Sequence, residues 1–172
     1  MKITPQQAPD NVREIPLSRG MVALVDDDDY DMLVSVGKWH ATPGTSGTYY
    51  ANRSITRPGG GQTTQGMHTL ISGWPYVDHR NGDGLDNRRA NLRQATDSQN
   101  QGNRRIGSNN TSGYKGVSRS GLKWRARIRL DGHQTHMGCY ATPQEAARAY
   151  DTASIKHFGE FARPNFPQGV DL

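Results

Sequence analysis

Four polar residues in the middle of this 172-residue chain have types and spacing that suit metal-assisted hydrolysis. Asp78 and His79 directly follow the apolar pair at 76–77, and Asn91 and Asn100 come one loop later. Carboxylate and amide oxygens are the ligands that hard divalent cations prefer. A histidine beside such a ligand titrates near neutral pH and is suited to take a proton from water. Each residue alone has an ordinary interpretation as polar surface or turn, so the prediction rests on their combination.

The local sequence also predicts the elements that position these residues. A short strand ends at the Asp–His pair, and residues 80–89 are too rich in Asn, Gly and Asp to form a regular element. A second short strand follows through residues 91–93. Thr96 then starts a helix, with Gln99 completing a capping box. The expected order of strand, loop, strand and helix brings the candidate ligands and the candidate base together.

The motif is specific enough over residues 67–103 to carry a family resemblance. The runs Met67-His68-Thr69-Leu70-Ile71, Val77-Asp78-His79-Arg80-Asn81-Gly82-Asp83, Asn87, Asn91-Leu92-Arg93 and Asn100 resemble the HNH nucleases of the phage and intron homing type. The resemblance implies a ββα-metal fold with one divalent metal, Mg²⁺ or Mn²⁺, per chain. By position, Asp78 and Asn100 are then the metal ligands. His79 is the general base, and Asn91 braces the loop and orients His79.

Two further positions qualify this resemblance. His68 matches the leading histidine of the motif, and both packing and a phosphate contact are open as its role. The last position holds Asn100 where many relatives have histidine, a replacement that homing-type members accept. Relatives with a structural zinc carry cysteine pairs, whereas this chain has the single cysteine Cys139. No structural zinc and no internal disulfide are therefore expected.

Positive charge is concentrated in the last third of the chain. Residues 104–172 carry a net charge of +6, against −1 for 1–67 and 0 for 68–103. Residues 123–130 alternate basic and apolar types, so a strand there presents four cations on one face and core residues on the other. A solvated face is the ordinary alternative. However, no acidic residue relieves the repulsion between these cations, which favours a nucleic-acid partner.

Three strands and one helix are expected in this part. The strands are predicted at 114–117, 123–130 and 133–140, with Asp131-Gly132 as the hairpin turn between the last two. Thr142, Pro143 and Glu145 begin the helix with a capping box, and Gly159 ends it.

Residues 108–167 resemble an AP2/ERF DNA-binding domain. The resemblance rests on Tyr114-Lys115-Gly116-Val117, Lys123-Trp124-Arg125-Ala126, Met137-Gly138-Cys139-Tyr140, Glu145-Ala146-Ala147-Arg148-Ala149-Tyr150-Asp151 and Asn165-Phe166. It implies a three-stranded sheet laid in the major groove of DNA. Ser118 and His136 stand where plant members more often have arginine and tryptophan, so no sequence preference is carried over. The expected DNA contacts are basic or polar residues of this part: Arg104, Arg105, Lys115, Arg119, Lys123, Arg125, Arg127, Arg129 and His136.

Residues 1–66 are expected to be rich in short strands. An apolar run at 21–25, a helix over 28–36 and a hairpin around the loop 42–48 are predicted, with Trp39 and the tyrosines in the core. The acidic run 26–29 lacks the oxygen spacing and glycine of a calcium loop. A solvated turn or helix start is therefore expected there.

The overall prediction is an α+β chain of four parts. A β-rich region at 1–66 supports a nuclease core at 67–103, a basic linker at 104–110 follows, and an AP2/ERF-like domain occupies 111–172. An ordinary surface loop is the alternative for the linker, whose two arginines favour an arm beside a polyanion. No stretch approaches the ~20 apolar residues that span a bilayer, so no membrane association is expected.

The predicted function is a site-specific DNA endonuclease of the homing type. It nicks one strand of double-stranded DNA, as a monomer without a protein partner, in the cytoplasm of a prokaryotic or phage-infected cell. The alternative is a sequence-specific DNA-binding regulator with an inactive nuclease segment. An RNA-binding protein is a weaker alternative, because exposed aromatic stacking motifs are not evident.

Overall fold

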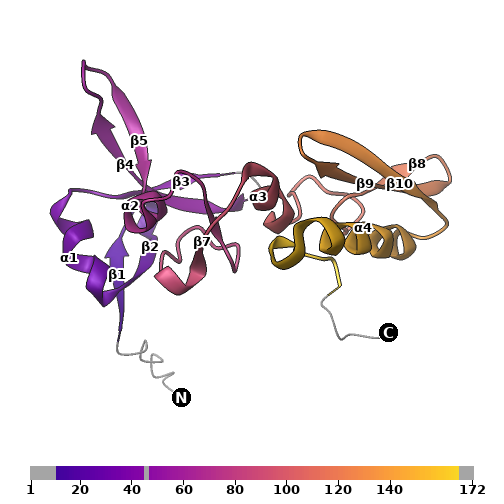
Figure 1. The fold of residues 1–172 in the computed structure, drawn as a ribbon, viewed down its shortest axis with the longest axis horizontal. Helices are drawn as coiled ribbons and strands as arrows, with labels where there is room; N and C mark the ends of the chain where they lie inside the picture. The colour runs from indigo at the N-terminus through magenta and orange to yellow at the C-terminus, as the bar shows by residue number, and fades with distance from the viewer. Residues whose placement is uncertain (1–10, 45–46, 167–172) are drawn as a thin grey trace. The chain divides into compact units, whose positions relative to one another are not determined.

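The chain folds into two compact units in the computed structural model, which describes residues 11–44 and 47–166. Residues 11–44 and 48–94 form the N-terminal unit, and residues 95–166, with Gly47, form the C-terminal unit (Figure 1). The boundary lies before Ala95 rather than after residue 103, because the helix that follows Ala95 packs with the C-terminal elements. No helix in the described ranges is long and apolar enough to span a membrane.

The N-terminal unit consists of short antiparallel ribbons and two helices. In chain order these are β1 Val12–Pro16, β2 Val22–Asp26, α1 Asp27–Ser35, β3 His40–Pro43, β4 Tyr49–Thr56, β5 Gln62–Gly66, α2 Met67–Ser72, β6 Val77–His79 and β7 Leu92–Gln94, with 3₁₀ turns at Ser18–Gly20 and Arg89–Asn91. β1 pairs with β2, β3–β4–β5 form one sheet, and β6 pairs with β7. The β4–β5 hairpin projects away from the rest of the unit (Figure 1).

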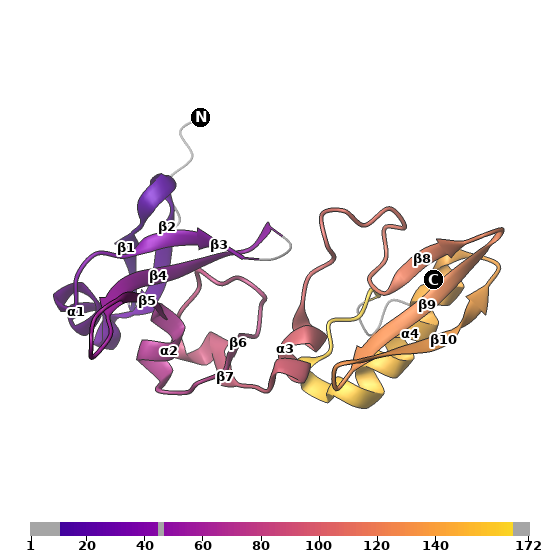
Figure 2. The same ribbon diagram turned by 90° about the horizontal axis from the view of Figure 1, so that it is seen from above.

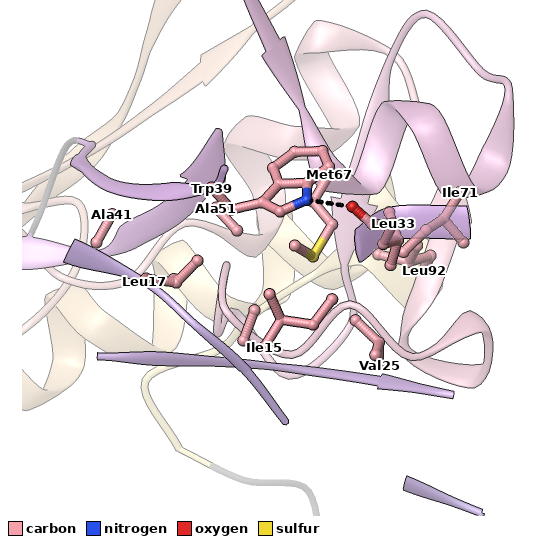
Figure 3. Close-up of a cluster of buried hydrophobic side chains, with 11 residues drawn as sticks. Ile15, Leu17, Val25, Leu33, Trp39, Ala41, Ala51, Met67, Ile71 and Leu92 are labelled. Atoms are coloured by element: carbon pink, nitrogen blue, oxygen red, sulfur yellow. Dashed lines mark hydrogen bonds between the residues drawn. The ribbon is translucent and has the colours of Figure 1, made fainter. Parts of the chain in front are cut away.

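One buried cluster joins these elements. Trp39 donates from Nε1 to the carbonyl of Leu33 at 2.8 Å, which fixes the end of α1 against the sheet (Figure 3). Met67, at the start of α2, is fully buried in the same cluster. The prediction of Trp39 as a core residue is therefore confirmed. The predicted hairpin forms between β3 and β4, although residues 45–46 of its loop lie outside the described ranges.

The acidic run at 26–29 does begin a helix, since α1 starts at Asp27 with acidic residues throughout its first turn. Carboxylates at this end complement the helix dipole. The expectation of a solvated run is wrong for Asp29, which is only 4% exposed. Its burial is explained by an arginine partner described below.

In the C-terminal unit, one long helix packs on a three-stranded sheet, and a short helix packs against the long one. The elements of this unit are α3 Asp97–Asn103, β8 Val117–Ser120, β9 Lys123–Leu130, β10 His133–Tyr140, α4 Pro143–Phe158 and the 3₁₀ turn η4 Gly159–Phe161. The antiparallel sheet has the order β10–β9–β8, and α4 runs along one of its faces (Figure 2). Small residues of α4, Ala146 and Ala147, pack on Val117 and Ala126 of the sheet.

Local signals in the sequence form as expected in this unit. Both capping boxes are present, at Thr96 with Gln99 and at Thr142 with Glu145. Asp131 and Gly132 both have positive φ, of 48° and 82°, as a two-residue hairpin turn of type I′ requires.

The first strand of this sheet is displaced from its predicted position at 114–117, since β8 begins at Val117. Gly116 has a φ of 77°, and a Cβ there would lie 2.0 Å from the ring of Tyr150. The chain therefore turns tightly against α4 at this glycine before the strand begins.

Helix α3 belongs to the C-terminal unit because it packs on α4 and η4. Ala95 shares a buried cluster with Phe158 and Phe161. The carbonyl of Gly102 accepts hydrogen bonds from the backbone of Arg163 at 3.1 Å and from Nζ of Lys115 at 2.6 Å. A Cβ on Gly102 would lie 2.6 Å from the ring of Phe158. A glycine inside this helix is therefore required by packing.

We predict that Gly102→Ala destabilises the chain although alanine is the better helix former. The gain in helix propensity of about 1 kcal/mol is outweighed by overpacking, which typically costs about 1–3 kcal/mol. Urea unfolding followed by circular dichroism measures the difference. Gln101→Ala, the neighbouring change on the same helix, is the control and should shift stability by less than about 0.5 kcal/mol. A Gly102→Ala variant as stable as the control would contradict the packing argument.

Candidate functional site

A buried ion pair lies on the ladder between β6 and β7. Asp78 and Arg93 are directly opposite each other in the antiparallel register. Nε and a terminal nitrogen of Arg93 lie 2.8 and 2.7 Å from Oδ2 of Asp78, and both side chains are 8% exposed. No role for Arg93 could be predicted from the sequence, since only the strand register reveals its contact with Asp78. The carboxylate thus enters the site already bound to a cation on one oxygen.

The donor chemistry of this carboxylate still fits a hard divalent cation. A carboxylate offers about four lone-pair positions on two oxygens, so it can serve an arginine and a metal together. Asn100, the second proposed ligand, lies half-buried on α3 in the C-terminal unit. The two residues therefore come from different compact units, and their pairing at one metal stays a prediction.

His79 lies next to Asp78 at the end of β6 and is 5% exposed. Its Nε2 is 3.3 Å from Oδ1 of Asn87 in the β6–β7 loop. The amide of Asn87 is oriented by its nitrogen, which donates to the carbonyl of Leu85 at 3.2 Å. The amide oxygen therefore faces the imidazole, so this bond forms with the tautomer that carries a proton on Nε2.

Burial lowers the pKa of His79 below the ordinary value for histidine. The hydrogen bond with Asn87 and the carboxylates of Asp78, Asp83 and Asp86 act in the opposite direction but are outweighed. The imidazole is therefore neutral at neutral pH, which is the form that accepts a proton.

Two more rings surround His79. The ring of His68, on α2, lies 5.2 Å from that of His79, and the ring of Tyr50, on β4, lies 5.8 Å from it. Nδ1 of His68 is buried and makes no hydrogen bond within the described residues. Burial and the neighbouring His79 lower the pKa of His68 to about 4, so this ring is uncharged at neutral pH. A buried polar atom without a hydrogen bond destabilises the folded protein, so Nδ1 of His68 is a candidate contact for a bound ligand.

Asn91 braces the loop that supplies Asn87. Its amide accepts from the backbone nitrogen of Asn81 at 3.0 Å and donates to the carbonyl of Asp86 at 2.7 Å. It also donates to the side chain of Asn81 at 3.1 Å. The loop side chain that hydrogen-bonds His79 is Asn87, which belongs to the sequence motif but has no predicted role there. Asn91 therefore acts on His79 indirectly, by holding the loop that carries Asn87.

A second candidate surface is the sheet face opposite α4 in the C-terminal unit. Residues 124, 126, 128 and 130 of β9 face the helix side, and Lys123, Arg125, Arg127 and Arg129 lie on the other face. β10 places His136 opposite Arg127 and Cys139 opposite Arg125. An open hollow of about 360 Å³ is lined there by Arg125, Arg127, Gln134, His136 and Cys139. No acidic residue lies on β8, β9 or β10.

Two predicted DNA contacts lie elsewhere. Arg119 is paired with Trp124 in the register, and its guanidinium lies 4.8 Å from that ring. Because directly opposite residues share a face, Arg119 lies on the helix side of the sheet. Lys115 donates to the carbonyl of Gly102, and burial lowers its pKa to about 8. The structure therefore does not bring Arg119 and Lys115 onto the face that carries Arg125 and Arg127. Arg104 and Arg105 are exposed directly after α3.

Known proteins resemble this chain in two ways. The HNH endonuclease family matches residues 74–101, which include Asp78, His79, Asn91 and Asn100. An uncharacterized HNH endonuclease of Acanthamoeba polyphaga mimivirus is 36% identical over 52% of this chain and 46% of its own length. Protein 3.8 of Escherichia phage T7 is 34% identical over 51% of this chain and 74% of its own length.

The second resemblance is to plant transcription factors. An ethylene-responsive transcription factor of Arabidopsis thaliana, ERF010, is 47% identical over 58 residues, which are 32% of either chain. The chain therefore spans less than half the length of this protein and of the mimivirus relative. No solved structure matches. The buried Asp–His pair inside the matched motif, together with these relatives, shows that the chain belongs to the HNH endonuclease family and carries an AP2-like domain.

Proposed function

We propose that the protein is a site-specific DNA endonuclease. Its N-terminal unit supplies the general base, and its AP2-like sheet recognises the target DNA. The observation that carries the proposal is the buried, uncharged His79, whose tautomer is fixed by Asn87 beside the carboxylate of Asp78. Within the family, the proposed fold of residues 67–103 is the ββα-metal fold.

His79 is the proposed general base. With its ring held by Asn87, His79 takes a proton from a water molecule that attacks the phosphorus of a DNA phosphodiester. The phosphorus–oxygen bond to the leaving nucleotide breaks, and the proton is held on His79 as an imidazolium. Asn87 and the nearby carboxylates favour that charged form, while burial keeps the resting form neutral.

Asp78 and Asn100 are the proposed ligands of one Mg²⁺ or Mn²⁺ ion, which when bound would stabilise the charge that develops on the leaving oxygen. Arg93 fixes the carboxylate of Asp78 in place. His68 is neutral, so its proposed contact with a phosphate is a hydrogen bond rather than an ion pair. Asn91 holds the loop.

The cationic face of β9 is the proposed DNA-reading surface, on Lys123, Arg125, Arg127 and Arg129 with His136. Arg104 and Arg105 are proposed to track phosphates beside it. A single proposed catalytic centre per chain favours nicking by a monomer. We propose an enzyme of the homing type in the cytoplasm of a prokaryotic or phage-infected cell, a setting that the phage relative supports. The alternative is a DNA-binding regulator, which the existing contact of Arg93 with Asp78 favours.

Cleavage by His79→Ala decides between enzyme and regulator. We expect wild type to nick supercoiled plasmid carrying its site with Mg²⁺ or Mn²⁺ and to stop on addition of chelator. The variant should lose about 10²–10⁴-fold in rate, the usual effect of a general base, while DNA affinity changes by less than about tenfold. Thermal melting of both proteins controls for folding. Equal cleavage rates would remove His79 from the mechanism.

The metal role of Asp78 must be separated from its ion pair. Asp78→Ala removes the carboxylate that pairs with the buried Arg93 and should cost about 3–5 kcal/mol of stability, whatever Asp78 does in catalysis. Asp78→Asn combined with Arg93→Gln replaces the pair by neutral hydrogen-bonding groups and should recover most of that loss. If Asp78 binds the metal, the stable double variant remains inactive, with Arg93→Gln alone as its control. Wild-type cleavage by the double variant at low metal would show that Asp78 is not a ligand.

The two faces of the C-terminal sheet give a matched test of the DNA surface. Replacing Arg125 and Arg127 by glutamine should weaken binding and make its dependence on log salt shallower, by about 1 for each phosphate that is no longer neutralised. Arg119→Gln removes one positive charge from the opposite face and should leave the slope unchanged. Gel shifts at several salt concentrations measure both. Similar slopes for the double variant and wild type would rule out this surface.

A further inference from the structure

The acidic start of helix α1 holds the loop that carries Asn87. Arg89 follows Asn87 by two residues and begins the 3₁₀ turn Arg89–Asn91. Its guanidinium bonds to both carboxylate oxygens of Asp29, with Nε at 2.8 Å and a terminal nitrogen at 2.6 Å. Its backbone nitrogen donates to Asp26 at 2.7 Å. Two carboxylates of α1 and its N-cap thus bind one loop residue through three hydrogen bonds.

The contact with Asp29 has a geometry that restricts movement. The Asp29 side chain is 5% exposed, whereas that of Arg89 is 59% exposed. A bidentate bond between guanidinium and carboxylate fixes direction as well as distance. Because Asp29 is fixed in the first turn of α1, the loop takes its position from that helix.

Strand β2 holds the same loop on the other side of Asn87. The nitrogen of Leu24 donates to the carbonyl of Leu85 at 2.8 Å, and the nitrogen of Asn87 donates to the carbonyl of Leu24 at 2.7 Å. These bonds form a parallel bridge between Leu24 and Asp86. The backbone of Asn87 is therefore held directly by β2, one residue away from the bridge.

Within the loop, the hydrogen bonds connect this anchor to the imidazole. Asp86 binds Arg88 through both oxygens, at 2.8 and 2.7 Å, and accepts from Asn81 at 2.9 Å. Asn91 closes the loop between Asn81 and the carbonyl of Asp86. Asn87 is the loop side chain that meets Nε2 of His79. A movement of the loop relative to β6, which carries His79, would change that contact.

We propose that Asp29 and Arg89 are positioning residues of the nuclease, which hold the β6–β7 loop so that Asn87 fixes the tautomer and direction of His79. The inference rests on the proposed function and assigns a role to the region before residue 67. A misplacement of about 1 Å in a catalytic site costs on the order of 10²-fold in rate. The effect is expected in kcat rather than in KM, because neither residue is a proposed DNA contact.

The test compares two carboxylates in the same turn of α1. Asp29→Asn and Arg89→Gln should each lower kcat for plasmid nicking by about tenfold to 10²-fold, with KM within about threefold. Asp27→Asn is the control, since Asp27 pairs with Arg13 at 2.9 Å on the exposed side and does not bind the loop. The exchanged pair, Asp29→Arg with Arg89→Asp, should recover part of the loss, whereas a general loss of stability would not be recovered.

A second measurement is independent of cleavage. Hydrogen exchange of the amides at 80–91, followed by mass spectrometry, should be faster in Asp29→Asn than in Asp27→Asn. Equal exchange in the two variants, or an unchanged kcat for Asp29→Asn, would overturn the inference. If wild type nicks no DNA under any metal condition, the proposed function fails, and the exchange result still decides whether Asp29 holds the loop. Arg89→Lys, which keeps the charge but loses the bidentate geometry, should show an intermediate exchange rate.

Discussion

The N-terminal unit is organised by the small size of the ladder that carries the candidate base. β6 and β7 share three residue pairs, and a two-stranded ribbon of that size is not stable by itself in water. One of the three pairs is a buried ion pair, so the ladder also contains two desolvated charges. Its support must come from outside. Met67 and Leu92 tie it to the common core, while β2 and α1 bind the loop that joins its strands. The residues before the motif are thus a structural requirement of the motif.

The two units use charge in opposite ways. In the N-terminal unit the buried carboxylates are matched, Asp78 by Arg93 and Asp29 by Arg89, so these charges fix geometry. On the C-terminal sheet, no acidic residue shares the face of Arg125 and Arg127, and their hydrogen bonds go to neutral groups such as Gln134 and Ser120. Matched charges suit a rigid site. Unmatched charges on an open face suit an anionic partner that brings its own charge.

Local signals in the sequence predicted much of this fold. Capping boxes, the Asp131-Gly132 turn and the alternation of β9 are each decided by neighbours in sequence, and all three are present. The features that could not be predicted depend on register and packing. Arg93 meets Asp78, and Arg119 meets Trp124, only because of how the strands are paired. The burial of Asp29 could not be predicted because its partner Arg89 is sixty residues away. The role of Asn87 could not be predicted because its amide direction depends on the folded loop.

The packing of α3 has a consequence for the order in which the chain folds as it is made. The N-terminal unit ends at Gln94, and domains generally fold from the N-terminus during synthesis. The seven-residue helix α3 is too short to be stable alone, and its partners Phe158 and Phe161 are synthesised only after it. A growing chain thus acquires a folded His79 well before it acquires a folded Asn100. In the proposed nuclease, the helix that carries Asn100 is therefore stabilised only after the sheet proposed to bind DNA has been synthesised.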